Sequence, residues 1–153
     1  TTDVGNQKPD GMYYDHMNNP QVPELLVWHR YLLGFLNDKQ IHCVTNGEIS
    51  THWLSPVAMD TKNVKGVVIP LSETEGVIIE SRRAIGFDKL LQNRPGLVGA
   101  VVYTLDSKIP YGRTPLKVIS TLKNKDSVTV GGYRVSVVES GAFGDVVKVE
   151  KIS

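Results

Sequence analysis

Four histidines and one cysteine are the side chains best suited to bind a metal or to act in covalent catalysis. The histidines are His16, His29, His42 and His52, and their spacings match neither an H-E-x-x-H helix nor another common zinc pattern. A metal site would need Asp15, His16, His29 and His42 to converge, and nothing in the sequence requires this. An enzyme that uses these histidines with a bound metal is therefore the least favoured hypothesis, and we predict no catalytic or metal-binding residue in this chain.

Cys43 is the only thiol, and it directly follows His42. Neighbours on a strand point to opposite faces, so the two side chains would not form a nucleophile and its base. We predict that Cys43 is a small buried apolar residue. No G-x-S-x-G elbow, phosphate-binding loop or dinucleotide fingerprint occurs, and Asp60, Asp106 and Asp145 lack the alternating oxygen ligands of a calcium loop. We therefore expect no self-contained active site and no cofactor.

Glu80 and Arg82 are a pair of opposite charges at the end of an apolar run. Alternate residues of a strand share a face, so both lie on the side of Ile78, and the intervening residues lie on the other side. We predict that the two side chains form an ion pair at the end of a sheet. The alternative, that they hold a carboxylate or cation of a ligand, is less favoured because buried ion pairs usually fix local structure.

Strands are the main elements expected to position these residues. Short apolar runs rich in Val and Ile, bounded by Gly, Pro or polar residues, predict strands. The short Ser72–Gly76 connection predicts that the first two runs form an antiparallel hairpin. The polar connection Asn46–Lys65 is either a surface excursion or holds one more short strand. The three central runs are Val67–Leu71, Val77–Ile79 and Leu97–Leu105.

The end of the chain predicts an antiparallel meander. A strand at Leu116–Leu122 precedes two alternating runs that flank Gly131–Gly132, which is the sequence of a tight hairpin turn. The loop Ser140–Asp145 then leads into a last alternating strand, Val146–Ile152. Together with the central strands, this meander favours a two-sheet sandwich or a twisted open sheet.

One helix is predicted, over Pro23–Leu36, where apolar residues recur at helical spacing. Trp28 and Leu32 lie on its apolar stripe. Gly34 is unfavourable inside a helix by about 1 kcal/mol relative to Ala, which indicates close packing or an early helix end. Residues 37–45 should turn out of the helix into a short strand. A helix this apolar must pack against the sheet or against a partner.

Composition places the chain among globular proteins. Of 153 residues, 41% are hydrophobic and 22% charged, and the net charge is +1 without a basic block. We therefore expect no nucleic-acid partner, and no apolar run approaches the roughly 20 residues of a membrane span. A single cysteine excludes an internal disulfide. The start at Thr-Thr suggests a processed product or an expressed fragment.

The predicted fold is mainly β (α+β), an antiparallel β-sandwich or twisted sheet with one N-terminal amphipathic helix packed on it. We divide the chain into two parts. Residues 1–45 hold an N-terminal arm, the helix and a short strand, and residues 46–153 form a β domain.

Several stretches, in order, resemble the C-terminal half of secreted bacterial zinc metallopeptidases of the immune inhibitor A type. The resemblance spans roughly residues 13–151. Asp15 and Met17 resemble the Met-bearing loop of that family, and Val27–Leu36 resembles the helix that follows it. The similar stretches are DHMNNPQVPELLVWHRYLLGFLNDKQIHCV, GVVIPLSETEGVIIESRRAIGFDKLL, GLVGAVVYTLDSKIPYGRTPLKVI and DSVTVGGYRVSVVESGAFGDVVKVEK.

The resemblance implies that the zinc site and the β-rich portion belong to different parts of a longer protein. The family's H-E-x-x-H helix precedes these stretches and has no counterpart here, so zinc is expected in an N-terminal half that is not present. Residues 1–45 would be the remnant of the catalytic domain, with Met17 packed beneath the metal and with Trp28 and Leu32 facing the zinc-bearing half. This chain would be the non-catalytic β-rich portion of a secreted protein, outside the cell or at its surface.

A second hypothesis needs no missing half. The chain would then be a stand-alone secreted β-sandwich module for adhesion, assembly or carbohydrate contact at the cell surface. Its partner would be a second copy of the chain, because edge strands such as Val146–Ile152 could pair between copies.

Overall fold

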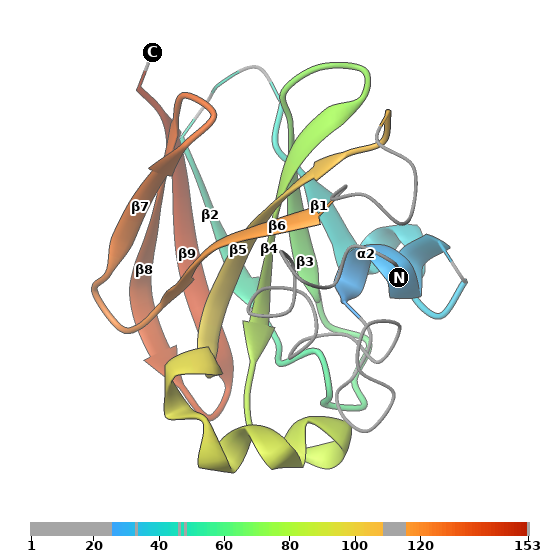
Figure 1. Cartoon of the computed structure of the whole chain (residues 1–153), viewed down its shortest axis with the longest axis vertical. Helices are drawn as coiled ribbons and strands as arrows, with labels where there is room; N and C mark the ends of the chain where they lie inside the picture. Colours follow the sequence, from blue (N-terminus) through green and yellow to red (C-terminus); the bar gives the residue numbers. More distant parts are fainter. Residues whose placement is uncertain (1–25, 33, 46, 48, 109–115, 153) are drawn as a thin grey trace.

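The structure is a computed structural model that describes residues 26–152 except Leu33, Asn46, Glu48 and residues 109–115. Within these residues the protein is mainly β, with strands in two sheets and little helix, as predicted (Figure 1). The helical elements are α2 (Val27–Leu32) and the 3-10 helices η1 (Asp38–Gln40), η2 (Gly86–Asn93) and η3 (Pro95–Leu97). The strands are β1 (Ile41–Cys43), β2 (Ser50–Leu54), β3 (Gly66–Pro70), β4 (Glu75–Arg82), β5 (Gly99–Asp106), β6 (Leu116–Leu122), β7 (Ser127–Val130), β8 (Tyr133–Gly141) and β9 (Gly144–Lys151).

The first sheet has five strands in the order β1-β3-β4-β5-β6, and we call it sheet A. β3 and β4 form the predicted antiparallel hairpin, and β1 pairs with β3 in parallel. β5 begins at Gly99 and not at the predicted Leu97, because Pro95 and Gly96 turn the chain into η3. β1 is the short strand expected within residues 37–45, and it forms an edge of sheet A.

The second sheet, sheet B, has four strands in the order β2-β9-β8-β7. The predicted tight turn joins β7 to β8, and Gly131 and Gly132 have φ values of 57° and 79°, which glycine adopts without strain. The connection Asn46–Lys65 holds one further strand, β2, which pairs with β9.

Two predictions about the last hairpin are wrong. The loop expected over Ser140–Asp145 is shorter, because β8 continues to Gly141 and β9 starts at Gly144. The strand expected at Val146–Ile152 is not an edge, because β9 lies between β2 and β8. Its backbone groups are therefore occupied on both sides, so it cannot pair between copies in the native fold.

The core between the sheets follows from strand alternation. Residues 77 and 79 of β4, with alternate residues of β3 and β5, face sheet B and pack against valines of β8 and β9. The opposite face of β4 and β5 carries Ile78, Val101 and Tyr103, which pack against Leu26. α2 lies on this second face, on the side away from sheet B (Figure 1). Sheet A is thus covered on both faces.

Helix α2 ends at Leu32, four residues before the predicted end at Leu36. Gly34 has a φ of 83°, its amide donates to Tyr31 O at 3.1 Å, and the Phe35 amide donates to Arg30 O at 2.8 Å. These two hydrogen bonds form a Schellman motif, in which a left-handed glycine ends a helix. Of the two explanations for Gly34, the early helix end is the correct one. Residues 23–25, at the predicted start, lie outside the described residues.

Candidate functional site

The carboxylate of Glu80 holds the start of α2 on sheet A. Its Oε1 accepts hydrogen bonds from the Val27 amide at 3.0 Å and from the Tyr103 hydroxyl at 2.6 Å, and Glu80 and Tyr103 are fully buried. A carboxylate that accepts an N–H of the first helical turn satisfies a donor that has no partner within the helix. The polar end of β4 therefore fixes where α2 begins.

Arg82 supplies the opposite charge. Its Nη2 lies 2.7 Å from Glu80 Oε2, and its Nη1 donates to both oxygens of Asp88, in η2, at 2.9 and 3.0 Å. Glu80 and Arg82 thus lie at the strand end as an ion pair, on the face shared with Ile78. We call the set of Val27, Glu80, Arg82, Asp88 and Tyr103 the α2 anchor.

Burial and charge act together on the α2 anchor. Burial lowers the pKa of Arg82, but the negative charges of Asp88 and Glu80 outweigh it and raise that pKa above its ordinary value. Burial raises the pKa of the Tyr103 hydroxyl, and the charge of Glu80 raises it further. Arg82 therefore stays charged and Tyr103 stays protonated at neutral pH. A tyrosine in this state donates a hydrogen bond and does not act as a base.

The far end of α2 faces solvent. Leu32 and Phe35 are 59% and 64% exposed, whereas Trp28 is half-buried and packs against the cluster of Leu26, Ile78 and Tyr103. The predicted partner-facing pair is thus divided, because Trp28 faces sheet A and Leu32 faces outward. We call Leu32 and Phe35 the exposed end of α2.

A groove of about 790 Å³ opens beside Phe35. One wall comes from Phe35, Leu36 and η1, and the other comes from the loop of residues 56–62. Leu36 and Val57 are buried, so they form an apolar floor. Asp60 and Lys62 are lining residues of the loop wall. We call this hollow the α2 groove.

The loop wall of the groove is held by a buried lysine. Lys65 Nζ contacts Ser55 Oγ at 3.3 Å, Pro56 O at 3.0 Å and Thr61 Oγ1 at 3.0 Å, so the loop folds around its ammonium group. Arg30 Nη1 donates to Val57 O at 2.6 Å and joins α2 to the same loop. Both walls are therefore tied to the sandwich by charged donors.

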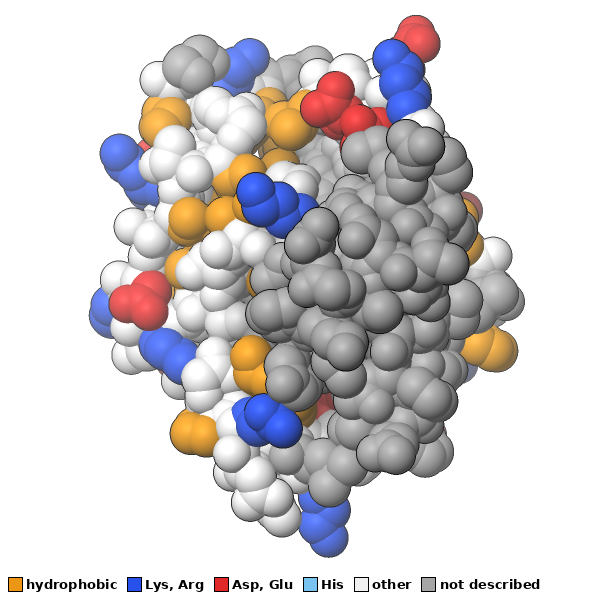
Figure 2. All heavy atoms as spheres, in the orientation of Figure 1, with side chains coloured by type: hydrophobic (Ala, Val, Ile, Leu, Met, Phe, Trp, Pro, Cys, Tyr) orange, Lys and Arg blue, Asp and Glu red, His pale blue; other side chains and the backbone are white. Residues whose placement is uncertain are grey.

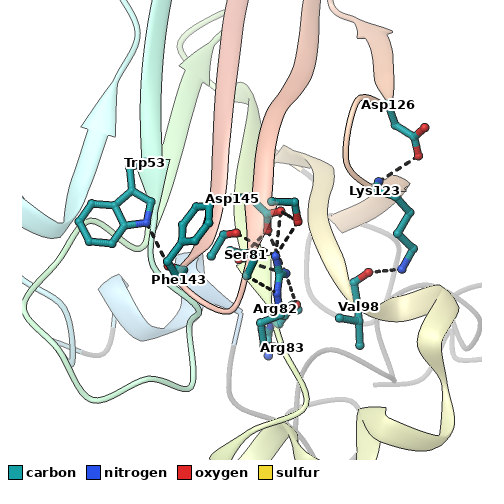
Figure 3. Close-up of polar contacts among 12 residues, drawn as sticks. Trp53, Ser81, Arg82, Arg83, Val98, Lys123, Asp126, Phe143 and Asp145 are labelled. Atoms are coloured by element: carbon teal, nitrogen blue, oxygen red, sulfur yellow. Dashed lines mark hydrogen bonds and ion pairs between the residues drawn. The ribbon is translucent and has the colours of Figure 1, made fainter.

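A second polar network joins the two sheets near the β8–β9 turn (Figure 3). Arg83 Nη2 lies 3.0 Å from Asp145 Oδ1 and donates to Ser140 Oγ at 2.8 Å, and the Ser81 hydroxyl donates to Asp145 Oδ2 at 2.6 Å. Arg82 and Arg83 are adjacent, so strand alternation sends one to the α2 anchor and the other to sheet B.

Next to Arg83 lies a smaller hollow of about 310 Å³, and Lys123 also lines it. Lys123 Nζ donates to the carbonyl oxygens of Pro95 and Val98. Burial lowers the pKa of Lys123, and the positive charge of Arg83 lowers it further. Both cations are already engaged by the protein, so this hollow offers a ligand little free charge.

The structure brings together two histidines that the sequence analysis did not pair. His42 Nδ1 lies 3.0 Å from His52 Nδ1, and His52 Nε2 lies 2.8 Å from Ser50 Oγ. Burial lowers the pKa of His52, and His42 lowers it further. Ten residues separate the two histidines, on strands of different sheets, and no sequence pattern signals such a contact.

The prediction that Cys43 is buried is wrong, because its side chain is exposed. β1 is a short edge strand, and Cys43 points away from the sandwich core, which Val44 reaches instead. Asp15, His16 and Met17 lie outside the described residues, and His29 lies in α2.

The described part of the chain holds no group of three or more His, Cys, Asp or Glu side chains arranged for a metal ion. It also holds no helix that is long and apolar enough to cross a membrane. On the described part of the face drawn in Figure 2, Lys and Arg side chains are scattered and do not gather in one patch.

Comparison with known proteins does not assign the chain to a family. No family model matches its sequence, and no curated protein and no solved structure is significantly similar to it.

The polar contacts of this region hold α2 and the loop wall of the α2 groove in place. In the described residues, every buried side-chain nitrogen and oxygen has a hydrogen-bond partner. Saturated buried networks make a structure rigid and specific. The arrangement is suited to holding the exposed end of α2 and the α2 groove in a fixed position.

Proposed function

We propose that this chain is a non-catalytic, β-rich module of a secreted metallopeptidase-like protein, and that it supports a zinc-bearing polypeptide segment packed against α2. The observation that carries the proposal is the exposed end of α2 beside the α2 groove. Leu32 and Phe35 expose more than half of their surface next to an apolar floor of Leu36 and Val57. Apolar surface at a groove is typical of an interface.

The way α2 is held supports the same function. Its start is bonded to Glu80, its end is closed by the Schellman motif at Gly34, and Arg30 ties it to the loop wall. A surface that is fixed before binding loses little conformational entropy when a partner arrives. The α2 groove is therefore preorganised to bind another polypeptide.

The occupant that we propose is the zinc-bearing half implied by the family resemblance. Its surface would have to present apolar side chains to Leu32, Phe35 and Val57. At the rim it would meet the mixed charges of Asp60 and Lys62. In this proposal the zinc ligands and the catalytic carboxylate belong to that segment, and the present chain positions it.

Site-specific cross-linking tests the proposal in the protein expressed from its complete natural gene. A photoreactive benzophenone amino acid replaces Phe35 in one variant and Ile49 in the control. Ile49 is a matched control because it is 66% exposed, against 64% for Phe35, and it lies next to β2. Cross-linked peptides are then identified by mass spectrometry.

We expect the probe at position 35 to cross-link, well above the level at position 49, to a segment of the same gene product that contains an H-E-x-x-H helix. Cross-links to a second copy of this chain would overturn the proposal in favour of self-association. Equal yields at the two positions, or a gene without such a helix, would also overturn it.

A second candidate is a surface module for carbohydrate contact, and one observation favours it. Trp53 is 47% exposed, and its Nε1 donates to Phe143 O at 3.0 Å, which fixes the indole at the end of sheet B (Figure 3). A fixed, exposed aromatic ring can pack against a sugar ring. Binding on a glycan array that is lost in Trp53→Ala would favour this candidate, and the absence of any bound glycan would remove it.

A further inference from the structure

His42 and His52 join the two sheets at the side of the sandwich where β1 and β2 lie. His42 lies on β1, an edge of sheet A, and His52 lies on β2, an edge of sheet B. Their Nδ1 atoms are 3.0 Å apart and their ring centroids are 5.3 Å apart, so the two nitrogens point at each other. Such a contact is a hydrogen bond in which one Nδ1 donates its proton and the other accepts it.

The hydrogen bond depends on how many protons the two rings carry. When both rings are neutral, one Nδ1 carries a proton and the other offers a lone pair. One added proton can go to an Nε2 atom and leaves this bond in place. A second added proton must go to the accepting Nδ1, which places two positively charged N–H groups opposite each other at the observed 3.0 Å. Like charges at this distance repel, so the contact breaks.

The surroundings of His52 favour its neutral form. His52 is half-buried, and burial lowers its pKa, which the positive charge of His42 lowers further. By strand alternation, the charged groups on the facing sides of the adjacent strands are Lys65, which precedes β3, and Asp145 and Lys151 of β9. None of these three groups contributes to the lowered pKa of His52. The second proton is therefore opposed by burial and by the partner ring.

β1 has few other contacts with sheet B. It has three residues and pairs with β3 in sheet A. Val44, which follows β1, reaches the core between the sheets, and its amide donates to Val68 O at 2.9 Å. Among the described residues, the contact of His42 with His52 is the only hydrogen bond from β1 to sheet B. A short edge strand of this kind is among the first parts of a fold to open.

β1 continues directly from η1, which forms part of one wall of the α2 groove. η1 ends at Gln40 and β1 begins at Ile41. Gln40 lines the groove, and its Nε2 donates to Thr61 O, on the loop wall, at 3.2 Å. Because no residue separates the two elements, a displacement of β1 is passed on to η1 and to this contact across the groove.

We infer that the contact of His42 with His52 is a proton-sensitive latch, which holds β1 and η1 in place in neutral solution and releases them in acid. The sign follows from the lowered pKa of His52. The unfolded chain takes up the proton near the ordinary value of 6.5, and the folded chain takes it up at lower pH. The latch therefore stabilises the fold fully above pH 6.5 and loses its effect as the pH falls below this value. The inference concerns the position of η1 and does not depend on what binds the α2 groove.

Nuclear magnetic resonance of the full chain tests the latch. At about pH 7.5 we expect a scalar coupling between the two Nδ1 nuclei, which reports a direct hydrogen bond. At about pH 5, exchange of the Gln40 and Val44 amides should be at least about tenfold faster relative to global unfolding, after correction for the intrinsic effect of pH. The amides of β8 and β9 should keep their protection. Unchanged relative protection of Gln40 and Val44 in acid, or no coupling at neutral pH, would overturn the inference.

His42→Gln is the variant that separates the latch from other effects of acid. Glutamine can donate or accept a hydrogen bond but does not take up a proton, so the acid response of Gln40 and Val44 should disappear. His42 is exposed on an edge strand, so this variant should fold. The control is His29→Gln, which changes a histidine of α2 outside the pair and should keep the response. The same acid response in His42→Gln as in the wild type would also overturn the inference.

Discussion

The two faces of sheet A show different ways to cover a sheet. Over its centre, its inner face meets sheet B through apolar side chains such as Val77, Ile79 and Val102, and the polar network of Ser81, Arg83 and Asp145 lies at one end. Its outer face meets α2 through aliphatic residues and also through the charged α2 anchor of Glu80, Arg82 and their partners. Both faces belong to the same strands, so the difference lies in the partner that each face must hold.

Apolar contacts and charged contacts contribute differently to the stability and to the specificity of the fold. Aliphatic packing supplies most of the free energy of folding, but many arrangements of similar volume satisfy it. A buried ion pair adds little net stability, yet breaking it is costly, so it selects one arrangement. We infer that the inner face stabilises the sandwich and that the outer face specifies the position of α2.

The largest effect should come from removing Arg82, the cation of the α2 anchor. Arg82→Met leaves the buried carboxylates of Glu80 and Asp88 without their shared positive partner, which should lower the free energy of unfolding by about 4 kcal/mol. The control is Arg134→Met, where Arg134 is half-exposed and 3.7 Å from Glu150, with an expected loss below about 1 kcal/mol. Urea unfolding measures both, and equal losses would contradict the role of Arg82.

A cavity on the inner face should cost somewhat less. Ile79 is fully buried between the sheets, and Ile79→Ala should lower the free energy of unfolding by about 3 kcal/mol. The register of α2 should stay unchanged, because the α2 anchor is intact. Urea unfolding gives the loss of stability, and amide exchange of α2 reports its position. Selective loosening of α2 would show that the two faces are not separate.

Tyr103→Phe removes one hydrogen bond to Glu80 and no bulk. The expected loss is about 1.5 kcal/mol, since the acceptor is a buried carboxylate. Tyr31→Phe is the control, because its hydroxyl bonds Asp38 at an exposed position, and it should change stability much less. Thermal unfolding of the two variants measures the difference, and an equal shift in both would count against a special role for Tyr103.

The stability of the wild type and of Tyr103→Phe at alkaline pH gives a second test of the role of Tyr103. The pKa of Tyr103 is raised in the folded state above its ordinary value of 10.0, so the folded state retains a proton that the unfolded state loses. Its contribution to stability is therefore complete below pH 10 and is lost as the pH rises above it. Wild-type stability should fall more steeply than that of Tyr103→Phe in this range, as measured by urea unfolding. Parallel curves would contradict the raised pKa.

The smallest effect is expected at the exposed end of α2. Leu32→Ser should change the free energy of unfolding by less than about 0.5 kcal/mol, because the side chain is mostly in solvent. Trp28→Ser, one turn earlier, should be far more costly because Trp28 packs against the cluster on sheet A. The losses of stability on thermal unfolding of the two variants show which side chain packs in the fold and which one only faces solvent. Similar losses would show that Leu32 also packs in the fold.

Local sequence patterns were sufficient to predict the strands and much of their orientation. Strand alternation placed Ile78, Glu80 and Arg82 on one face, and the Gly131–Gly132 pair marked the β7–β8 turn. Gly34 signalled the end of α2. Each of these depends on residues close together in the chain, where the spacing of side chains is fixed by the backbone.

Contacts between distant segments could not be predicted. Glu80 binds the amide of Val27, 53 residues away, and this depends on how α2 sits on sheet A. The position of β9 in the middle of sheet B depends on pairing with β2, which no local pattern encodes. The contact of His42 with His52 depends on the spacing of two sheets. For the same reason the exposure of Cys43 was predicted wrongly.

Amide hydrogen exchange at Val27 most directly tests whether Glu80 holds α2 in place. Glu80→Met removes the acceptor of this amide but leaves Arg82 paired with Asp88. We predict that exchange at Val27 and in the rest of α2 becomes at least about tenfold faster relative to global unfolding, while β8 and β9 keep their protection. Unchanged relative protection of Val27 in this variant would contradict the account.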